Sequence, residues 1–371
     1  RARLASTFVS NERLHPLHSS EMPYRRQLSA LSLPLLMSLG ACIDSHGLAK
    51  NRPAHHTEDG FQNNYLPPER MTKSFSQLWR WSQHRIEQEP IQFESIEPDA
   101  DFLRENRTVP TLTWIGHSTF LWQYQGVNLI TDPHLTQRAS PVNFLGPQRL
   151  VEPGISLTDL PVIDIVIISH NHYDHLDRKT VSALVEQQPA NPPLFLVPLG
   201  LKDWFADIGI NEKVIELDWW QSHRVGDWEL NAVPVQHWSR RGLFDTNKTL
   251  WAGWVIEAPE QKMFFAGDTG YSQDFKDIGE RFGSMDISLI PIGAYAPRWF
   301  MQDMHVNPDE AVQIHQDVQS RFSVGMHWGT FLNLTDEPLL EPSQRLKEVL
   351  TERKLSPDSF ITLKHGQTLR L

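Results

Sequence analysis

The chain has 371 residues, of which 34 are Lys or Arg and 45 are Asp or Glu, so its formal net charge is −11. Hydrophobic residues make up 40% and charged residues 21%, a globular composition that excludes a largely disordered, collagen-like or polytopic membrane chain. The acidic balance argues against a general nucleic-acid binder, so we expect no nucleic-acid partner. The chain has 17 histidines but one cysteine, Cys42, which excludes an intramolecular disulfide and a cysteine-rich zinc cage.

The sequence before Cys42 has the parts of a secretory signal. Met22 is followed by a basic pair, Arg25 and Arg26, then by a short apolar stretch and by Leu-Gly-Ala directly before the cysteine. The stretch is shorter than the roughly 20 residues that a transmembrane helix needs. We therefore expect residues 1–42 to be a targeting segment with Met22 as its candidate start.

Residues 43–107 are expected to be a linker and N-terminal extension. The first part is polar and rich in Asn, His and Pro, and we interpret His55 and His56 in it as solvated linker residues. In residues 69–90, four large apolar side chains recur at helical spacing, which predicts a helix that caps the main body.

Residues 108–371 alternate between strand and helix patterns, which predicts one α/β domain with mixed sheets. Residues 111–133 read as a hairpin of half-buried strands that turns at Gln125-Gly126, and the apolar run 162–169 as a central strand buried on both faces. No dinucleotide fingerprint or P-loop is present, so a nucleotide site has no support. Helices are expected over 178–187 (capped by Asp177), 201–207 and 272–282, from a capping box at Asn307, and over 343–353, before a final hairpin over 361–371.

A cluster of metal-ligand side chains directly follows the apolar strand at 162–169. Imidazole and carboxylate are ligand types that zinc selects, and two cations about 3.5–4 Å apart form a hydrolytic site. Three further candidates each follow a later apolar strand, where sites are usually built. The sequence therefore predicts a metal site from His170, His172, Asp174, His175, His237, Asp268 and His327.

The pattern His-x-His-x-Asp-His, followed by His, Asp and His in that order, resembles the metallo-β-lactamase superfamily. Longer strings such as LDWW, GAYAPRWFM and HVNPDEAV make the chain similar to the N-acyl phosphatidylethanolamine phospholipase D family. The resemblance extends from about residue 111 to LKHG near the end of the chain and leaves out the N-terminal 70 residues. It implies a four-layer αββα sandwich that follows an N-terminal extension.

The resemblance also implies a binuclear zinc phosphodiesterase that converts N-acyl phosphatidylethanolamine into N-acylethanolamine and phosphatidic acid. Two Zn²⁺, or other divalent transition metals, would lower the pKa of a bridging water from 15.7 toward about 7, and the hydroxide would attack phosphorus. One zinc would be held by His170, His172 and His237, the other by Asp174, His175 and His327, with Asp268 bridging. Asp174, Asp268 and His305 would be the catalytic residues.

Other residues are expected around these ligands. His117 and Asp132 are candidates for contacts that orient the ligands, and His305 for a substrate or proton-transfer role. Arg298 could pair with phosphate while Trp299 meets acyl chains.

Two other functions stay open at this point. One is a hydrolase of the same fold that acts on another ester, lactone or phosphodiester, and the other is a non-enzymatic metal- or lipid-binding envelope protein. The expected partners are a phospholipid substrate and a membrane, and the family resemblance leaves a homodimer open. We expect lipid anchoring at Cys42 in a bacterial cell envelope, facing the periplasm, with a cytoplasmic or peripheral membrane location as the alternative.

Overall fold

A computed structural model of the chain describes residues 52–71 and 73–371. The expected targeting segment and Cys42 lie outside these residues. Among the helices in the described part, none has the length and hydropathy that a bilayer-spanning segment needs.

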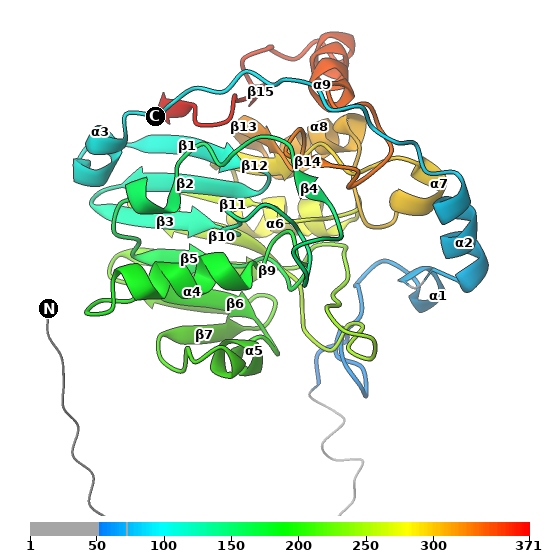
Figure 1. The fold of residues 1–371 in the computed structure, drawn as a ribbon, viewed down its shortest axis with the longest axis horizontal. Helices are drawn as coiled ribbons and strands as arrows, with labels where there is room; N and C mark the ends of the chain where they lie inside the picture. Colours follow the sequence, from blue (N-terminus) through cyan, green and yellow to red (C-terminus); the bar gives the residue numbers. More distant parts are fainter. Residues whose placement is uncertain (1–51, 72) are drawn as a thin grey trace, which may run out of the picture. The chain divides into compact units, whose positions relative to one another are not determined.

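Two seven-stranded mixed sheets organise the described residues (Figure 1). The first sheet has the order β16-β1-β2-β3-β5-β6-β7, formed by β16 (Thr368–Arg370), β1 (Thr111–Gly116), β2 (Thr119–Tyr124), β3 (Val127–Thr131), β5 (Ile165–Ile167), β6 (Leu194–Pro198) and β7 (Val214–Leu217). The second has the order β15-β13-β12-β11-β10-β9-β8, formed by β15 (Phe360–Thr362), β13 (Ser320–Met326), β12 (Met285–Pro291), β11 (Gln261–Phe265), β10 (Gly253–Ala258), β9 (Trp228–Val233) and β8 (Ser222–Val225). A short ladder joins β4 (Gln148–Arg149) and β14 (Phe331–Leu332).

Helices cover the outer faces of the two sheets, which gives the expected four-layer αββα sandwich. Apolar side chains of the first sheet pack against α3 (Ala100–Glu105), α4 (Arg178–Gln187) and α5 (Lys202–Asp207). The second sheet packs against α6 (Asp274–Phe282), α8 (Pro308–Asp317) and α9 (Glu341–Glu352). Three short helices lie outside these layers: α1 (Pro68–Met71), α2 (Phe75–Gln83) and α7 (Arg298–Met301).

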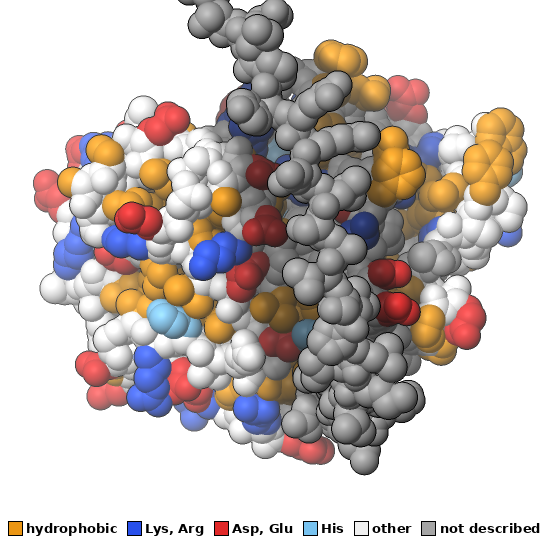
Figure 2. Space-filling model, turned by 90° about the horizontal axis from the view of Figure 1, so that it is seen from below, with side chains coloured by type: hydrophobic (Ala, Val, Ile, Leu, Met, Phe, Trp, Pro, Cys, Tyr) orange, Lys and Arg blue, Asp and Glu red, His pale blue; other side chains and the backbone are white. Residues whose placement is uncertain are grey.

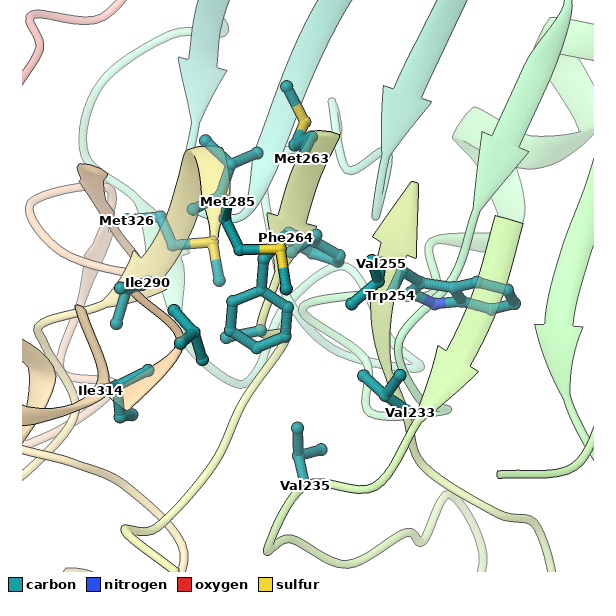
Figure 3. Packing of buried hydrophobic residues seen from close by; sticks show 14 of the residues in the cluster. Val233, Val235, Trp254, Val255, Met263, Phe264, Met285, Ile290, Ile314 and Met326 are labelled. Carbon is teal, nitrogen blue, oxygen red and sulfur yellow. The ribbon is translucent and has the colours of Figure 1, made fainter. Parts of the chain in front are cut away.

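The core between the sheets is continuous with the core under α6 and α8. Trp254, Val255 and Phe264 come from neighbouring strands of the second sheet, and Ile314 reaches this cluster from α8 (Figure 3). Each of these side chains is fully buried. Burial on both faces of the sheet explains the apolar character of its strands, because neither face meets water.

Several expected elements are confirmed at residue level. Asp177 caps α4, where its side chain accepts a hydrogen bond from Lys179 N–H, and Asn307 and Glu310 form a capping box at the start of α8. α2 forms within the expected capping helix, but it has no buried residue. Trp81 stacks on Phe300, and Arg80 lies over the ring of Trp299.

Two strand predictions are wrong. The strands over 111–131 are buried on both faces rather than half-buried, and a second turn at His117-Ser118 makes them a three-stranded meander. The final hairpin does not form either, since β15 pairs with β13 in one sheet and β16 with β1 in the other. Both errors have one cause, which is that pairing and second-face burial depend on segments far away in the sequence.

The interpretation of His55 and His56 as solvated linker residues is also wrong. His55 is 7% exposed, and both imidazoles contact the carboxylate of Asp218. The segment that carries them packs on the main body as part of the same compact unit, residues 52–371.

The part of the surface that Figure 2 shows in colour or white has mixed charge. In the view of Figure 2, Lys and Arg side chains are interspersed with Asp and Glu, with hydrophobic side chains between them. A single basic field of the kind that binds nucleic acid is absent from this visible part.

Candidate metal centre

All seven predicted ligands lie where strands of the two sheets end. Four of them occupy the loop between β5 and α4, and the others follow β9, β11 and β13. Side chains that are far apart in the sequence therefore meet at the carboxyl ends of β5 and of the parallel strands β11 and β13. His170 and His327, for example, are separated by 157 residues.

The first donor cluster consists of three imidazoles. His170 Nε2 lies 2.8 Å and His237 Nε2 lies 3.3 Å from His172 Nδ1. Two of the three outer nitrogens have protein partners: His237 Nδ1 donates to the carbonyl of Met304 at 2.9 Å, and His170 Nδ1 lies 2.9 Å from Ser169 Oγ. Burial lowers the pKa of all three imidazoles, to about 4 for His172. They are therefore neutral at pH 7, the form that binds a metal.

The second donor cluster combines two imidazoles with two carboxylates. His175 Nε2 and His327 Nε2 each lie 3.3 Å from Asp174 Oδ2 and 3.1 Å from Asp268 Oδ2. Two ligands of one tetrahedral zinc, each about 2.0–2.1 Å from the ion, are separated by about 3.3 Å. Asp268 Oδ2 also lies 3.9 Å from His237 Nε2, so this carboxylate stands between the two clusters.

The charge balance of the second cluster suits a divalent cation. Burial acts to raise the pKa of Asp174 and Asp268, yet the neighbouring imidazoles outweigh it and hold both pKa values well below the usual range. Burial acts to lower the pKa of His175 and His327, but the carboxylates outweigh it and raise that of His327 to about 9. Two buried negative charges are thus balanced by protons on imidazoles, and a cation can replace those protons.

An unpartnered ligand atom points to the same conclusion. Asp268 Oδ1 is buried and has no hydrogen-bond partner among the described residues. Since a buried polar atom without a partner costs about 1–3 kcal/mol, an unpartnered carboxylate oxygen between the two clusters indicates a missing ligand. The donor set therefore fits bound metal.

His117 and Asp132 contact the second cluster from the first sheet. His117 Nε2 lies 3.0 Å from Asp174 Oδ2, and burial, together with the charge of His327, lowers the pKa of His117 well below its usual value. Asp132 Oδ2 accepts from His175 Nδ1 at 2.7 Å, which leaves His175 Nε2 free to bind a metal.

Backbone strain is also present at this place. His117, Asp132 and His327 have φ values of 54°, 32° and 60°, in a region that residues other than glycine seldom adopt. Such conformations cost about 1–3 kcal/mol each and persist where surrounding contacts impose them, typically at functional sites.

His305, Arg298 and Trp299 have different positions relative to the metal ligands. His305 is 12% exposed, and its Nδ1 lies 3.9 Å from Asp268 Oδ2 without a hydrogen-bond partner among the described residues. Burial lowers its pKa to about 4. Arg298 donates to the carbonyl of His305 at 2.7 Å and binds both carboxylate oxygens of Glu310, so its guanidinium is committed to protein partners. Trp299 lies under the guanidinium of Arg80, a contact with α2 and not with the ligands.

The sequence analysis missed several residues that contact the ligands. The carbonyl of Met304 orients His237, Ser169 bonds to both Asp132 and His170, and Asn63 binds the backbone of His237. Adjacency to His170 was the only signal for Ser169, and no local signal existed for Asn63.

Two cavities lie near the candidate centre, and none of the seven predicted ligands lines either of them. One, of about 460 Å³, includes His305 and is lined mainly by apolar side chains, among them Met71, Leu78, Trp81, Phe300, Met301 and Met304. The other, of about 620 Å³, includes Tyr173 of the ligand loop and four cationic side chains, Arg138, Arg178, Lys179 and Arg241. The cavity that includes His305 could receive an apolar part of a ligand.

Comparisons with known proteins agree with this geometry. The β-lactamase superfamily domain matches residues 127–328. The N-acyl-phosphatidylethanolamine-hydrolyzing phospholipase D 1 of Caenorhabditis elegans is 42% identical over 268 residues, which is 69% of this chain and 74% of that protein. The mitochondrial protein of the same description from Saccharomyces cerevisiae is 38% identical over 65% of this chain and 51% of its own length.

Among solved structures, the isothiocyanate hydrolase from Delia radicum gut bacteria superimposes with a TM-score of 0.55 at 22% identity, covering 70% of this chain and 99% of that one. At this identity the likeness concerns the fold alone.

Proposed function

The chain belongs to the metallo-β-lactamase superfamily of hydrolases, as a relative of the N-acyl-phosphatidylethanolamine-hydrolyzing phospholipases D, and from this premise we propose that it cleaves N-acylated phosphatidylethanolamine as a binuclear zinc phospholipase D. The first zinc would be held by His170, His172 and His237, and the second by Asp174, His175 and His327. Asp268 would contact both.

The observation that carries the proposed substrate class is the apolar cavity beside His305. It adjoins the candidate metal centre and has room for part of an acyl chain, while the cationic cavity near Tyr173 is suited to negative charge. The mainly apolar lining of this cavity suits a substrate that carries an acyl chain.

The proposed reaction breaks the bond between phosphorus and the ethanolamine oxygen. Water supplies a hydroxyl group to phosphorus and a proton to the departing oxygen, which yields phosphatidic acid and N-acylethanolamine. Two zinc ions bound to the donor set would supply Lewis acidity and a water of lowered pKa. The protein needs no nucleophile of its own.

The side chains around the donors would hold the reacting groups in place. His117 and Asp132 fix Asp174 and the Nδ1–H tautomer of His175 through the hydrogen bonds described above. A lowered pKa keeps His305 neutral at pH 7, so its imidazole has one N–H to donate to a substrate oxygen and one nitrogen lone pair to accept a proton. Arg298 holds the His305 backbone by its hydrogen bond to the carbonyl.

We further propose that the protein is attached to the cell envelope through a lipid on Cys42 and faces the periplasm. The signal-like sequence that ends at this cysteine supports the proposal, and a lipid-anchored enzyme would meet its phospholipid substrate at the membrane surface.

A mass-spectrometric assay tests the proposed reaction. Purified protein is incubated with vesicles that contain N-acylated phosphatidylethanolamine, plain phosphatidylethanolamine or phosphatidylcholine. We expect N-acylethanolamine and phosphatidic acid from the first substrate only, and loss of both products in Asp268→Asn. Turnover of a lactone or of another phosphodiester without any release of N-acylethanolamine would overturn the proposed substrate.

A further inference from the structure

The segment from residue 53 to residue 66, here called the strap, runs from the loop between β7 and β8 to the candidate metal centre. It begins with a tight turn in which Thr57 N–H donates to the carbonyl of Gly60, and Phe61 N–H then donates to the carbonyl of Asn247. Gly60 is required at this point, because a Cβ atom there would lie 2.2 Å from the Asn247 oxygen. The strap is therefore fitted closely against the main body.

A double-histidine clamp holds the beginning of the strap. His55 Nε2 lies 2.6 Å from one oxygen of Asp218 and His56 Nε2 lies 2.8 Å from the other. Each imidazole faces its own carboxylate oxygen at hydrogen-bond distance, so the pair holds the strap to Asp218. The His55 ring also stacks on Trp219 with 4.4 Å between ring centroids.

The strap brings the side chain of Asn63 to the backbone of His237. Asn63 Oδ1 accepts from His237 N–H at 3.0 Å, and Asn63 Nδ2 donates to the His237 carbonyl at 2.9 Å. A side-chain amide offers the same donor and acceptor as a peptide group, so Asn63 binds His237 as a neighbouring strand would. Trp251 Nε1 donates to the same Asn63 oxygen at 3.1 Å, which fixes the orientation of the amide.

His237 needs such a partner because it lies beyond the end of β9, which stops at Val233. Its ring is held at Nδ1 by the Met304 carbonyl, and its backbone is held on both sides by Asn63. Both are buried, with Asn63 at 5% and His237 at 0% exposure. Without Asn63, the peptide groups on either side of the imidazole would be left unpaired in a buried place.

We propose that Asn63 is a positioning residue that sets the backbone of His237 and thereby the affinity of the first donor cluster for its metal. This inference rests on the proposed metal centre. The sequence analysis treated the strap as a solvated linker. In this proposal the strap instead supports the metal site, and the double-histidine clamp holds it to the main body.

Cobalt(II) binding tests the inference without any substrate. Asn63→Ala is compared with Asn64→Ala, a matched control one residue further along the strap, whose side chain donates to Asp274 at 2.8 Å and makes no contact with His237. Each protein is stripped of metal and titrated with cobalt in competition with a chelator. The visible spectrum and the thermal unfolding midpoint are recorded at each step.

We expect Asn63→Ala to bind one of two cobalt ions about 10- to 100-fold more weakly, with altered visible bands, as for other contacts that orient a ligand. Asn64→Ala should keep the wild-type affinity and spectrum. Asn63→Asp serves as a second variant if the alanine variant fails to fold. It keeps the acceptor for His237 N–H but loses the donor to the carbonyl, so we expect a weaker site again.

Wild-type affinity and spectrum in both Asn63 variants would overturn the inference, as would equal changes in Asn63→Ala and Asn64→Ala, since the strap would then be merely structural. A wild-type protein that takes up no cobalt would instead overturn the proposed metal centre itself. The two failures are therefore distinguishable.

Discussion

Asp132 accepts a hydrogen bond from Nδ1 of His175 at 2.7 Å, and the same carboxylate accepts from the backbone and hydroxyl of Ser169. Burial raises the pKa of Asp132, while His175 and Ser169 oppose that rise. This contact forces His175 to carry its proton on Nδ1 and to present Nε2 to the second donor cluster.

Asp132→Asn should therefore weaken metal binding at the second cluster by about 10- to 100-fold, because an amide nitrogen facing His175 favours the wrong tautomer. Metal content after dialysis against a chelator measures this loss. Asp274→Asn replaces another buried carboxylate, which bonds to Asn64 and Ser272 and to none of the seven ligands, and should keep the wild-type metal content. Equal metal content in both variants would contradict the proposed role of Asp132.

His305→Asn should separate turnover from metal binding. The side chain lies beside the donors but is assigned to none of them, so we expect both metal ions to remain while the rate falls by roughly 100- to 10,000-fold, the range for a proton-transfer or orienting group. His223→Asn, on β8 at the edge of the second sheet, should leave the rate unchanged. Loss of a metal ion from His305→Asn would make this residue a ligand instead.

Gly267→Ala should weaken the metal centre through a steric clash next to the ligands. Gly267 has a φ of 61°, and a Cβ atom there would lie 2.6 Å from the Cβ atom of Ser169, the residue before His170. Gly226 has a similar φ of 58° with open space around it, so Gly226→Ala isolates the cost of a left-handed backbone, about 1–2 kcal/mol. We expect Gly267→Ala to lose about 1–3 kcal/mol more because of the clash, and to bind metal more weakly. Chemical denaturation and metal titration measure the two effects, and equal losses in the two variants would exclude the packing argument.

His365 should make the fold sensitive to acid. Burial, with a contribution from the charge of Arg149, lowers the pKa of His365 to about 3, against about 6.5 in the unfolded chain. Between these values the unfolded chain binds a proton that the folded chain does not. Stability is therefore complete above pH of about 6.5 and falls as the pH drops toward 3, by at most about 1.4 kcal/mol per unit.

His365→Gln should flatten this part of the stability curve, measured as the free energy of unfolding at a series of pH values. The exchange keeps a polar group within reach of Thr330 Oγ1, which lies 3.0 Å from His365 Nε2. His223→Gln is the control and should keep the wild-type slope. An unchanged slope in His365→Gln would mean that other groups cause the acid sensitivity.

Cys42→Ser should release the protein from the membrane fraction when it is expressed in a bacterial host that processes lipoproteins. The physical reason is the loss of acyl chains, each of which contributes about 0.8 kcal/mol per buried methylene. Ser45→Ala, three residues further along, should stay with the membranes. Membrane association that is the same in Cys42→Ser and wild type would exclude the anchor.

Much of the fold and of the metal centre followed from local patterns. Apolar runs with ligand-type side chains directly after them located His170, Asp268 and His327 at strand ends, and the cap residues Asp177 and Asn307 located two helix starts. These features depend on neighbours a few residues away, which the sequence displays directly.

Other features were decided only by the tertiary structure. The last two strands separate into different sheets, His55 and His56 are drawn onto Asp218, and Asn63 pairs with His237 although 174 residues separate them. Each of these outcomes depends on which distant segment offers a hydrogen-bond partner or a buried surface. The histidines and aspartates that follow apolar runs indicated the chemistry of the site, whereas long-range packing decided which residues hold these ligands in place.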